Sequence, residues 1–335
     1  MQAKAKKPAK FVSYAKYGYL FILPFFLAYA FFMIYPLINT FILSFFGNGT
    51  QSGASTNDFV GFQNYQWLLF GDGSAPDAIT QGSSIQKAFW SSLGNTVILW
   101  VGNFIVQLVL SLLLAVWFSD VRVKLKGAGF FKVAMYLPNI VTAASVAGLF
   151  ILLFRSDNYG AVNGTLANWG VIENTINGWI PFANDPWISR IIVMLIQSWM
   201  WFGNTTLLLM SGIFGIDPSI YEAASIDGSS GAHTFFKITM PILKPIFIYV
   251  VITSMIGGLQ MFDIPFLFNE GTVSNHLKTS AVFIFEQFHS DPVSRNYGFS
   301  AAASILLFII TAILGVVIYR FNTDSTAPVK KRRNK

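Results

Sequence analysis

The chain has 335 residues, of which 54% are hydrophobic and only 11% are charged. A water-soluble domain of this length needs far less apolar surface for its core, so the composition excludes a soluble globular protein and indicates one that lies in a lipid bilayer. The lack of cysteine excludes disulfides and thiolate chemistry, and three scattered histidines suggest no metal site. The formal net charge of +7 sits beside long apolar stretches, a pattern typical of membrane insertion and not of nucleic-acid binding.

Six segments are long and apolar enough to cross a bilayer as helices, for which about 20 residues are required. In chain order they are 17–46, 93–118, 133–154, 188–214, 246–268 and 299–319. The polar stretch after the first span predicts a loop with one short helix over Gln63–Phe70. Pro24, Pro36 and Pro138 lie in or near spans and predict kinks. The predicted fold class is an all-α membrane protein with six transmembrane helices.

Basic residues fall unequally on the two sides that these spans define. Of the 22 Lys and Arg residues, 17 belong to the amino terminus, to the loops after the second and fourth spans, or to the carboxyl terminus. Because cytoplasmic segments carry an excess of Lys and Arg, both termini are predicted to be cytoplasmic. The predicted organisation is a basic amino-terminal segment over 1–16, a transmembrane domain over 17–320 and a basic tail over 321–335.

The segment 217–245, between the fourth and fifth spans, lies on the predicted cytoplasmic side. Asp217 can cap a short helix that begins at Pro218, and Asp227-Gly228 is expected to end this helix. The first part of the segment is therefore predicted to be a short, exposed helix.

A second short helix is predicted to follow. Ser229 or Ser230 can cap it, and it is expected to run through Lys237. Pro241 and Pro245 are then expected to block a simple helical run into the fifth span. The two helices would project from the membrane with small residues that let a partner's backbone approach closely, although an ordinary surface loop explains the same pattern.

The same segment carries spaced residues that point to a family. They are Glu222-Ala223-Ala224, Asp227-Gly228, Phe235, Ile238, Pro241, Leu243 and Pro245. This set resembles the signature cytoplasmic loop of ABC importer permeases. Shorter matches outside the segment resemble the sugar-permease branch of that family, and they are Tyr136-Leu137-Pro138, Leu259–Asp263 and Tyr297-Gly298-Phe299. The resemblance covers most of the chain.

Two departures from the family pattern concern the external side. Asn269-Glu270-Gly271-Thr272 stands where Thr-Gly-Gly-Pro is often found after the fifth span. A large external insert known from the branch is also missing.

The resemblance implies a type I ABC importer permease of the bacterial cell membrane. It implies that Glu222, Ala223, Ala224 and Asp227 belong to the loop that couples to a cytoplasmic ATPase, with Gly228 at its turn. No Gly is followed by Lys in the chain, so the phosphate-binding Gly-Lys-Ser/Thr motif is missing. ATP and Mg are therefore expected on a separate ATPase dimer, and no cofactor is expected on this chain. The other implied partners are a second homologous permease subunit, an external solute-binding protein and the lipid bilayer.

Polar side chains inside apolar spans are candidates for a solute pocket. Gln197, Trp201 and Asn204 recur at i, i+4 and i+7 in the fourth span and so share one helix face. Gln260 and Asp263 have the i, i+3 spacing of helix neighbours in the fifth span. Such a set can bind sugar hydroxyls while an indole covers an apolar sugar face, and the resemblance implies that these two spans line the sugar pocket. The alternative is that the same residues form hydrogen bonds between helices.

The predicted function is the permease subunit of an ATP-driven importer that carries a carbohydrate or related polar solute by alternating access. A stand-alone secondary transporter or channel is the alternative, but the two halves of the chain show no convincing repeat with broken helices. A membrane-embedded enzyme would need paired ionisable groups near the membrane surface, whereas Asp263 is the only ionisable residue placed well inside a span. The chain is therefore not predicted to be an enzyme.

Overall fold

The computed structural model describes residues 15–47, 58–72, 81–119, 126–173, 175, 178–268, 275–289 and 297–323. Within these residues the regular structure is helical, apart from one isolated antiparallel bridge between Phe46 and Phe59. Most of the predicted basic amino-terminal segment, most of the basic tail and the departure at Asn269–Thr272 lie outside the described residues.

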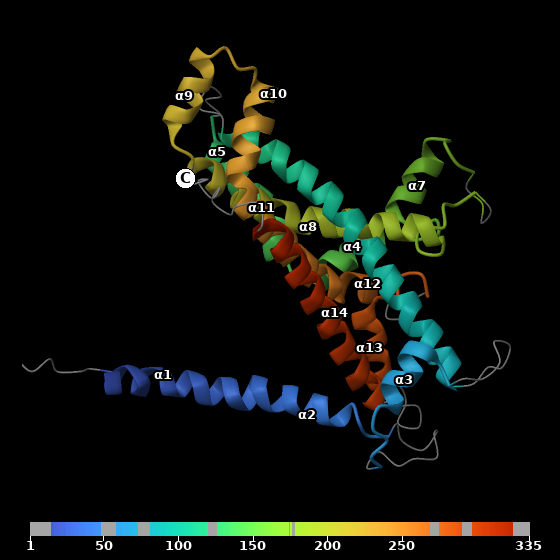
Figure 1. Cartoon of the computed structure of the whole chain (residues 1–335). Helices are drawn as coiled ribbons and strands as arrows, with labels where there is room; N and C mark the ends of the chain where they lie inside the picture. The colour runs from blue at the N-terminus through green and yellow to red at the C-terminus, as the bar shows by residue number, and fades with distance from the viewer. Residues whose placement is uncertain are drawn as a thin grey trace, which may run out of the picture.

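The long helices α4, α8 and α14 run between the two ends of the molecule (Figure 1). Their bounds are α1 (Ala15–Tyr29), the π-helix η1 (Ala30–Ile34), α2 (Tyr35–Leu43), α3 (Gln63–Phe70), α4 (Gln81–Ser119), α5 (Ala128–Ile140), α6 (Ala143–Leu153), α7 (Ala161–Asn168), α8 (Pro186–Phe214), α9 (Pro218–Ile226), α10 (Gly231–Thr234), the π-helix η3 (Phe235–Thr239), α11 (Met240–Leu259), α12 (Asp263–Leu267), α13 (Ser280–His289) and α14 (Tyr297–Thr323). The short helix expected over Gln63–Phe70 is α3, and its bounds are confirmed.

Five helical runs in the described part of the chain are long and apolar enough to cross a membrane. They are Tyr17–Leu43, Ser84–Ser119, Pro186–Phe214, Gly231–Leu267 and Tyr297–Arg320. The third predicted span is a pair of helices, α5 and α6, bent by 91°. Six crossings result when this bent pair counts as one, which agrees with the predicted fold class.

The bend in the third span follows from its local sequence. Pro138 has no N–H to bond within α5, which weakens the last helical turn. Val141 is extended, and the hydroxyl of Thr142 then caps α6 by accepting a hydrogen bond from the N–H of Ser145. The kink expected near Pro138 is therefore confirmed.

The expected block between the coupling segment and the fifth span is wrong. The chain runs from Gly231 through η3 into α11 as one helical run, although it contains Pro241 and Pro245. In η3 the N–H of Met240 bonds to the carbonyl of Phe235, five residues earlier. This wider turn accommodates the proline ring that follows.

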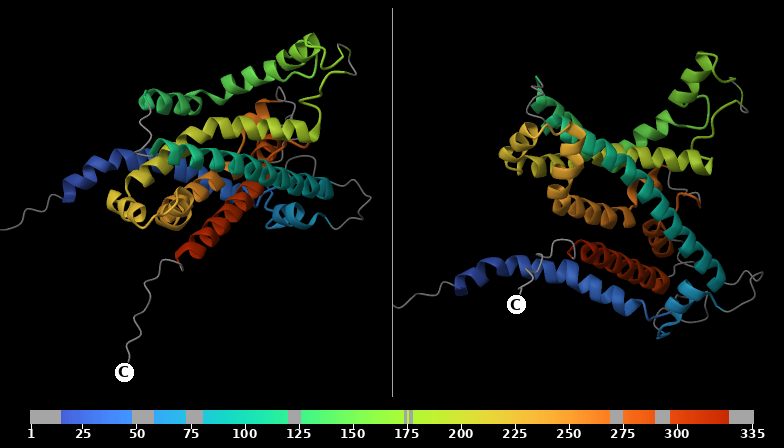
Figure 2. Two further views of the ribbon diagram at one scale, coloured as in Figure 1. Left: turned by 90° about the horizontal axis from the view of Figure 1, so that it is seen from above. Right: turned by 45° about the horizontal axis from the view of Figure 1, so that its top comes forward.

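The two longest helices in the described residues, α4 and α8, pack side by side and form the centre of the molecule (Figure 2). Leu99 of α4 and Val193 and Ile196 of α8 are buried in the main apolar core. The carboxylate of Asp185 caps α8 by accepting hydrogen bonds from the first free backbone N–H groups. This pair of helices therefore fixes the frame in which the polar residues of α8 are placed.

The short helices α3, α7, α9 and α10 lie at two opposite ends of the long helices. Figure 1 shows α9 and α10 at the end where α14 finishes, and α3 and α7 at the ends of α4 and α8 farthest from them. The first span lies apart from the central pair, where α2 packs against α14. None of its described side chains from Tyr17 to Leu43 is buried, so this span presents its apolar surface to lipid or to another protein.

Close approach of α5 to α8 depends on Gly203. A Cβ at this position would collide with the backbone carbonyl of Met135 on α5. Small residues allow such contacts between membrane helices. Because the obstacle is backbone, it cannot rotate away as a side chain could.

We predict that Gly203→Ala lowers the stability of the protein by about 1–3 kcal/mol, the usual cost of overpacking. The measurement is the midpoint of thermal unfolding in detergent. Gly148→Ala on α6 is the matched control, because a Cβ there meets nothing within 4 Å. Equal midpoints for the two variants would contradict the packing argument.

Candidate functional site

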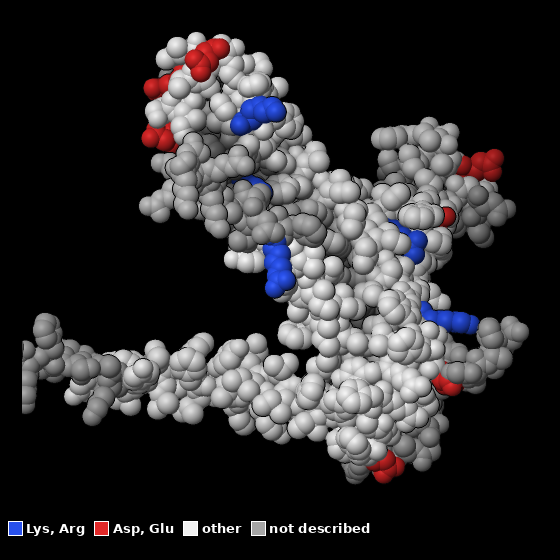
Figure 3. Space-filling view, in the orientation of Figure 1, with Lys and Arg blue, Asp and Glu red and all other residues white. Residues whose placement is uncertain are grey.

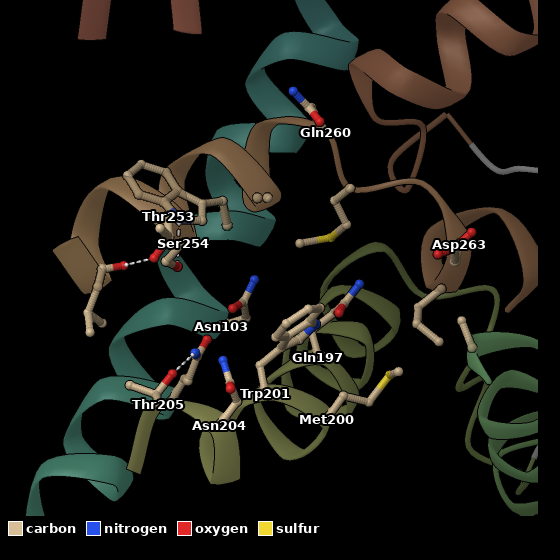
Figure 4. A pocket seen from close by; sticks show the side chains of 18 of the residues that line it. Asn103, Gln197, Met200, Trp201, Asn204, Thr205, Thr253, Ser254, Gln260 and Asp263 are labelled. Carbon is tan, nitrogen blue, oxygen red and sulfur yellow. Dashed lines mark hydrogen bonds between the residues drawn. The ribbon is translucent and has the colours of Figure 1, made fainter. Parts of the chain in front are cut away.

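A cavity of about 280 Å³ lies between α4, α8, α11 and α12. Its lining includes all five predicted pocket residues, which are Gln197, Trp201, Asn204, Gln260 and Asp263. Figure 4 shows that they come from two walls of the cavity, α8 on one side and the region between α11 and α12 on the other. The structure thus brings the five predicted residues to one place.

The wall formed by α8 has the predicted helical spacing. Gln197, Trp201 and Asn204 lie on one face of this helix and point to the cavity (Figure 4). Trp201 is half-exposed, whereas Gln197 is only 8% exposed. This wall presents two amides and one aromatic ring to any solute that enters.

The opposite wall is formed by a break in the fifth span. α11 ends at Leu259 and α12 begins at Asp263, so Gln260 and Asp263 flank the break. The expectation that they are neighbours on one helix face is therefore wrong, although both line the cavity. The physical reason is Pro265, which cannot donate a hydrogen bond to the carbonyl of Met261 four residues earlier, so the helix cannot continue unchanged.

Sequence reasoning missed the contribution of α4. Asn103 and Gln107 of α4 also line the cavity, together with Thr205 of α8. Asn103 and Gln107 lie four residues apart in an apolar span. A polar side chain inside an apolar span is the same signal that identified Gln197. They could have been found by applying that criterion to the second span.

Hydrogen bonding separates structural amides from available ones. The side chain of Gln107 donates to the hydroxyl of Thr205 at 2.6 Å, and the side chain of Asn103 donates to the carbonyl of Leu99 at 3.1 Å. In the described part of the chain, the amides of three other lining residues have no protein hydrogen-bond partner, and these are Gln197, Asn204 and Gln260. The amide of Gln107 therefore joins two helices, while the amides of Gln197, Asn204 and Gln260 are available to a solute.

The cavity carries little charge. Among its described lining residues, Asp263 is the only one with a charged side chain. The described residues contain no group of three or more His, Asp or Glu side chains placed to hold a metal ion. The arrangement therefore suits hydrogen bonding and stacking more than metal chemistry.

The predicted coupling residues form a second, separate feature around α9. The carboxylate of Asp217 caps α9 by accepting a hydrogen bond from the N–H of Ser219, and this bond lowers the pKa of Asp217. Gly228 has φ of +70°, the left-handed conformation that favours glycine, and it makes the predicted turn. The capped helix and the turn confirm the local structure expected from the sequence.

The outer face of α9 is acidic. Glu222 and Asp227 are exposed together with Asp217, and Figure 3 shows acidic side chains gathered at this end of the molecule. Ala223 is exposed, whereas Ala224, on the inner face of α9, is buried. Ala224 is thus a packing residue of the loop and not part of its surface.

Comparison with known proteins gives relatives along most of the chain. The lactose transport system permease protein LacF of Rhizobium radiobacter is 30% identical over 302 residues, which cover 89% of this chain and 91% of LacF. The trehalose/maltose transport system permease protein MalF of Thermococcus litoralis is 28% identical over 313 residues, which cover 92% of this chain and 96% of MalF.

Two crystal structures share the fold. A chain of a bacterial ABC transporter involved in the import of the acidic polysaccharide alginate superposes with a TM-score of 0.74 at 20% identity, covering 93% of this chain and 96% of that chain. The same kind of transporter in complex with alginate pentasaccharide-bound periplasmic protein gives a TM-score of 0.73 at 20% identity, with the same coverage. The predicted fold of a type I ABC importer permease is confirmed.

The family model described as "Binding-protein-dependent transport system inner membrane component" matches residues 107–324. The matched region is more than half of the chain and includes α8, α9 and α11. The resemblance found in the sequence to ABC importer permeases is therefore confirmed. The chain belongs to the family of inner membrane components of binding-protein-dependent transport systems.

Proposed function

We propose that the chain is the permease subunit of an ATP-driven importer that moves an oligosaccharide or a related polar solute across the bacterial cytoplasmic membrane. The observation that carries the proposal is the cavity between the spans, where amides without protein partners among the described residues face an indole ring. The named solutes of two relatives, lactose for LacF and trehalose or maltose for MalF, support a carbohydrate.

The cavity can recognise a sugar through complementary contacts. Each free amide of Gln197, Asn204 or Gln260 can both donate to and accept from a sugar hydroxyl. The indole of Trp201 can cover the apolar face of a sugar ring. Asp263 can accept a hydrogen bond from a hydroxyl at the opposite wall. Water can replace these hydrogen bonds, which suits a site that must release its solute.

ATP hydrolysis is proposed to take place on a separate ATPase dimer, which would hold ATP and Mg. α9 and α10 form the proposed contact, because they project from one end of the molecule with Glu222 and Asp227 exposed. Movement at this contact can reach the cavity because the helical run from Gly231 continues through α11 to Leu259, the residue before Gln260. A continuous helical run therefore connects the proposed coupling segment to the proposed solute site.

The remaining partners follow from the same proposal. The carboxyl terminus would be cytoplasmic, since α9 and the end of α14 lie at the same end of the molecule. The amino terminus would be cytoplasmic as well, because its segment is rich in Lys. A second homologous permease subunit would complete the pathway, and the unburied apolar surface of the first span is available for contact with it or with lipid. An external solute-binding protein would deliver the solute at the opposite end.

We predict that Gln197→Ala and Asn204→Ala each slow sugar uptake by about fivefold or more, because each removes a hydrogen bond to a hydroxyl. The measurement is uptake of radiolabelled lactose or trehalose into proteoliposomes that contain the complete transporter. Gln107→Ala is the contrasting variant, since its amide is engaged by Thr205. It should lower the thermal unfolding midpoint, because it leaves a buried hydroxyl unpaired. Unchanged uptake in both cavity variants would support a purely structural role for the amides.

We predict that Glu222→Ala and Gly228→Pro uncouple uptake from ATP hydrolysis while membrane insertion stays normal. Loss of a charged hydrogen bond costs about 1.5–3 kcal/mol, so the ratio of solute moved to ATP hydrolysed should fall by about tenfold or more. Proline cannot adopt the positive φ of Gly228. Ser225→Ala, on the exposed part of the same helix, is the control. Normal coupling in both variants would refute the assignment of this segment.

A further inference from the structure

The segment 275–279, which precedes α13, is tied to α4 and α8 by side chains that do not line the cavity. The guanidinium of Arg190 on α8 donates to the carbonyl of His276 at 3.1 Å and to the side-chain oxygen of Asn95 on α4 at 2.7 Å. The amide of Asn95 donates to the carbonyl of Asn275 at 2.7 Å. One arginine and one asparagine thus bridge two spans and hold the backbone of a third element.

The charge in this network rests on Arg190. Burial lowers the pKa of His276, the nearby cation of Arg190 lowers it further, and Asp185 opposes these effects. The guanidinium is therefore the cation that donates hydrogen bonds to this segment. Hydrogen bonds from a cation are stronger than neutral ones, so Arg190 holds the segment firmly.

The far end of the segment reaches the broken span. Thr279 is fully buried, and its hydroxyl donates to the carbonyl of Met261 at 2.6 Å. In a continuous helix this carbonyl would bond to the N–H of residue 265, which is a proline and has none. Thr279 therefore supplies the hydrogen bond that the sequence of the fifth span cannot make for itself.

The Met261 carbonyl lies in the middle of the break that forms one wall of the cavity. Gln260 precedes it and Asp263 follows it by two residues, and both line the cavity. The backbone between them is held by the bond from Thr279. Losing that bond would leave a buried carbonyl without a partner, which favours rearrangement of the break.

We infer that Thr279 is a positioning residue for the solute site, because its hydroxyl fixes the backbone that presents Gln260 and Asp263 to the cavity. Arg190 and Asn95 act one step further away by holding the segment that carries Thr279. The consequence for solute rests on the proposed function, whereas the positioning itself does not.

The test uses thiol accessibility, because the chain has no cysteine of its own. Single Gln260→Cys and Asn204→Cys reporters are placed in the complete, otherwise cysteine-free transporter in proteoliposomes. The rate of modification by a charged methanethiosulfonate reagent is measured with Thr279, with Thr279→Ser and with Thr279→Val. Thr279→Val should change the rate at Gln260→Cys by about fivefold, the factor that corresponds to one net hydrogen bond of about 1 kcal/mol.

The selective pattern decides the outcome. Thr279→Ser keeps the hydroxyl and should restore the original rate, and the Asn204→Cys reporter on α8 should not respond to either variant. An unchanged rate at Gln260→Cys in Thr279→Val would overturn the inference. Equal changes at both reporters would also overturn it, because the effect would then not be confined to the break.

A second pair of variants guards against failure of Thr279→Val to fold. Arg190→Met should shift the rate at Gln260→Cys in the same direction as Thr279→Val. Arg155→Met removes an arginine from an exposed ion pair with Asp157 outside the network and should leave the rate unchanged. The same rate in Arg190→Met and Arg155→Met would count against the network.

Uptake of radiolabelled lactose or trehalose by the transporter without a cysteine reporter gives the separate functional result. If the reporters respond as expected while the transporter carries neither sugar, the positioning role stands and the solute is neither lactose nor trehalose. If the sugars are carried and the reporters do not respond, the positioning role is wrong and the proposed function stands.

Discussion

Every buried backbone carbonyl in a membrane protein needs a hydrogen-bond donor, and this constraint shapes the cavity. Pro265 removes the donor that the Met261 carbonyl would have in a helix, and the hydroxyl of Thr279 replaces it. Because the carbonyl is satisfied, the fifth span can stop at Leu259 and restart at Asp263. An irregular backbone is tolerated within a span when it is enclosed by protein and lines a cavity.

The same constraint explains how prolines fit elsewhere in the spans. η1 precedes Pro36 and η3 precedes Pro241, with one residue between each π-helix and its proline. The wider π-turn moves the preceding carbonyls away from the proline ring, so the helix continues. For η3 the result is a continuous helical run from α10 to the cavity, which matters for the proposed coupling because a continuous helix transmits displacement better than a flexible loop.

Sequence reasoning succeeded where a single helix carries the information. The period of 3.6 residues placed Gln197, Trp201 and Asn204 on one face, and the structure has them on one wall of the cavity. It failed for prolines, because the rule that proline interrupts a helix does not take the neighbouring backbone into account. Pro241 by itself predicts an interruption, but the π-turn of η3 preserves the helix, and the break beside Gln260 follows from Pro265.

The sequence by itself determined the membrane-spanning class, the family, the capped helix α9 and the identity of the polar residues in the fourth and fifth spans. Those properties depend on composition and on residues close together in the chain. Only the tertiary structure decided which amides are engaged, because the partner of Gln107 is Thr205 on another helix. It also decided that Thr279 supports the break, since that hydrogen bond joins residues whose proximity depends on how separate helices pack.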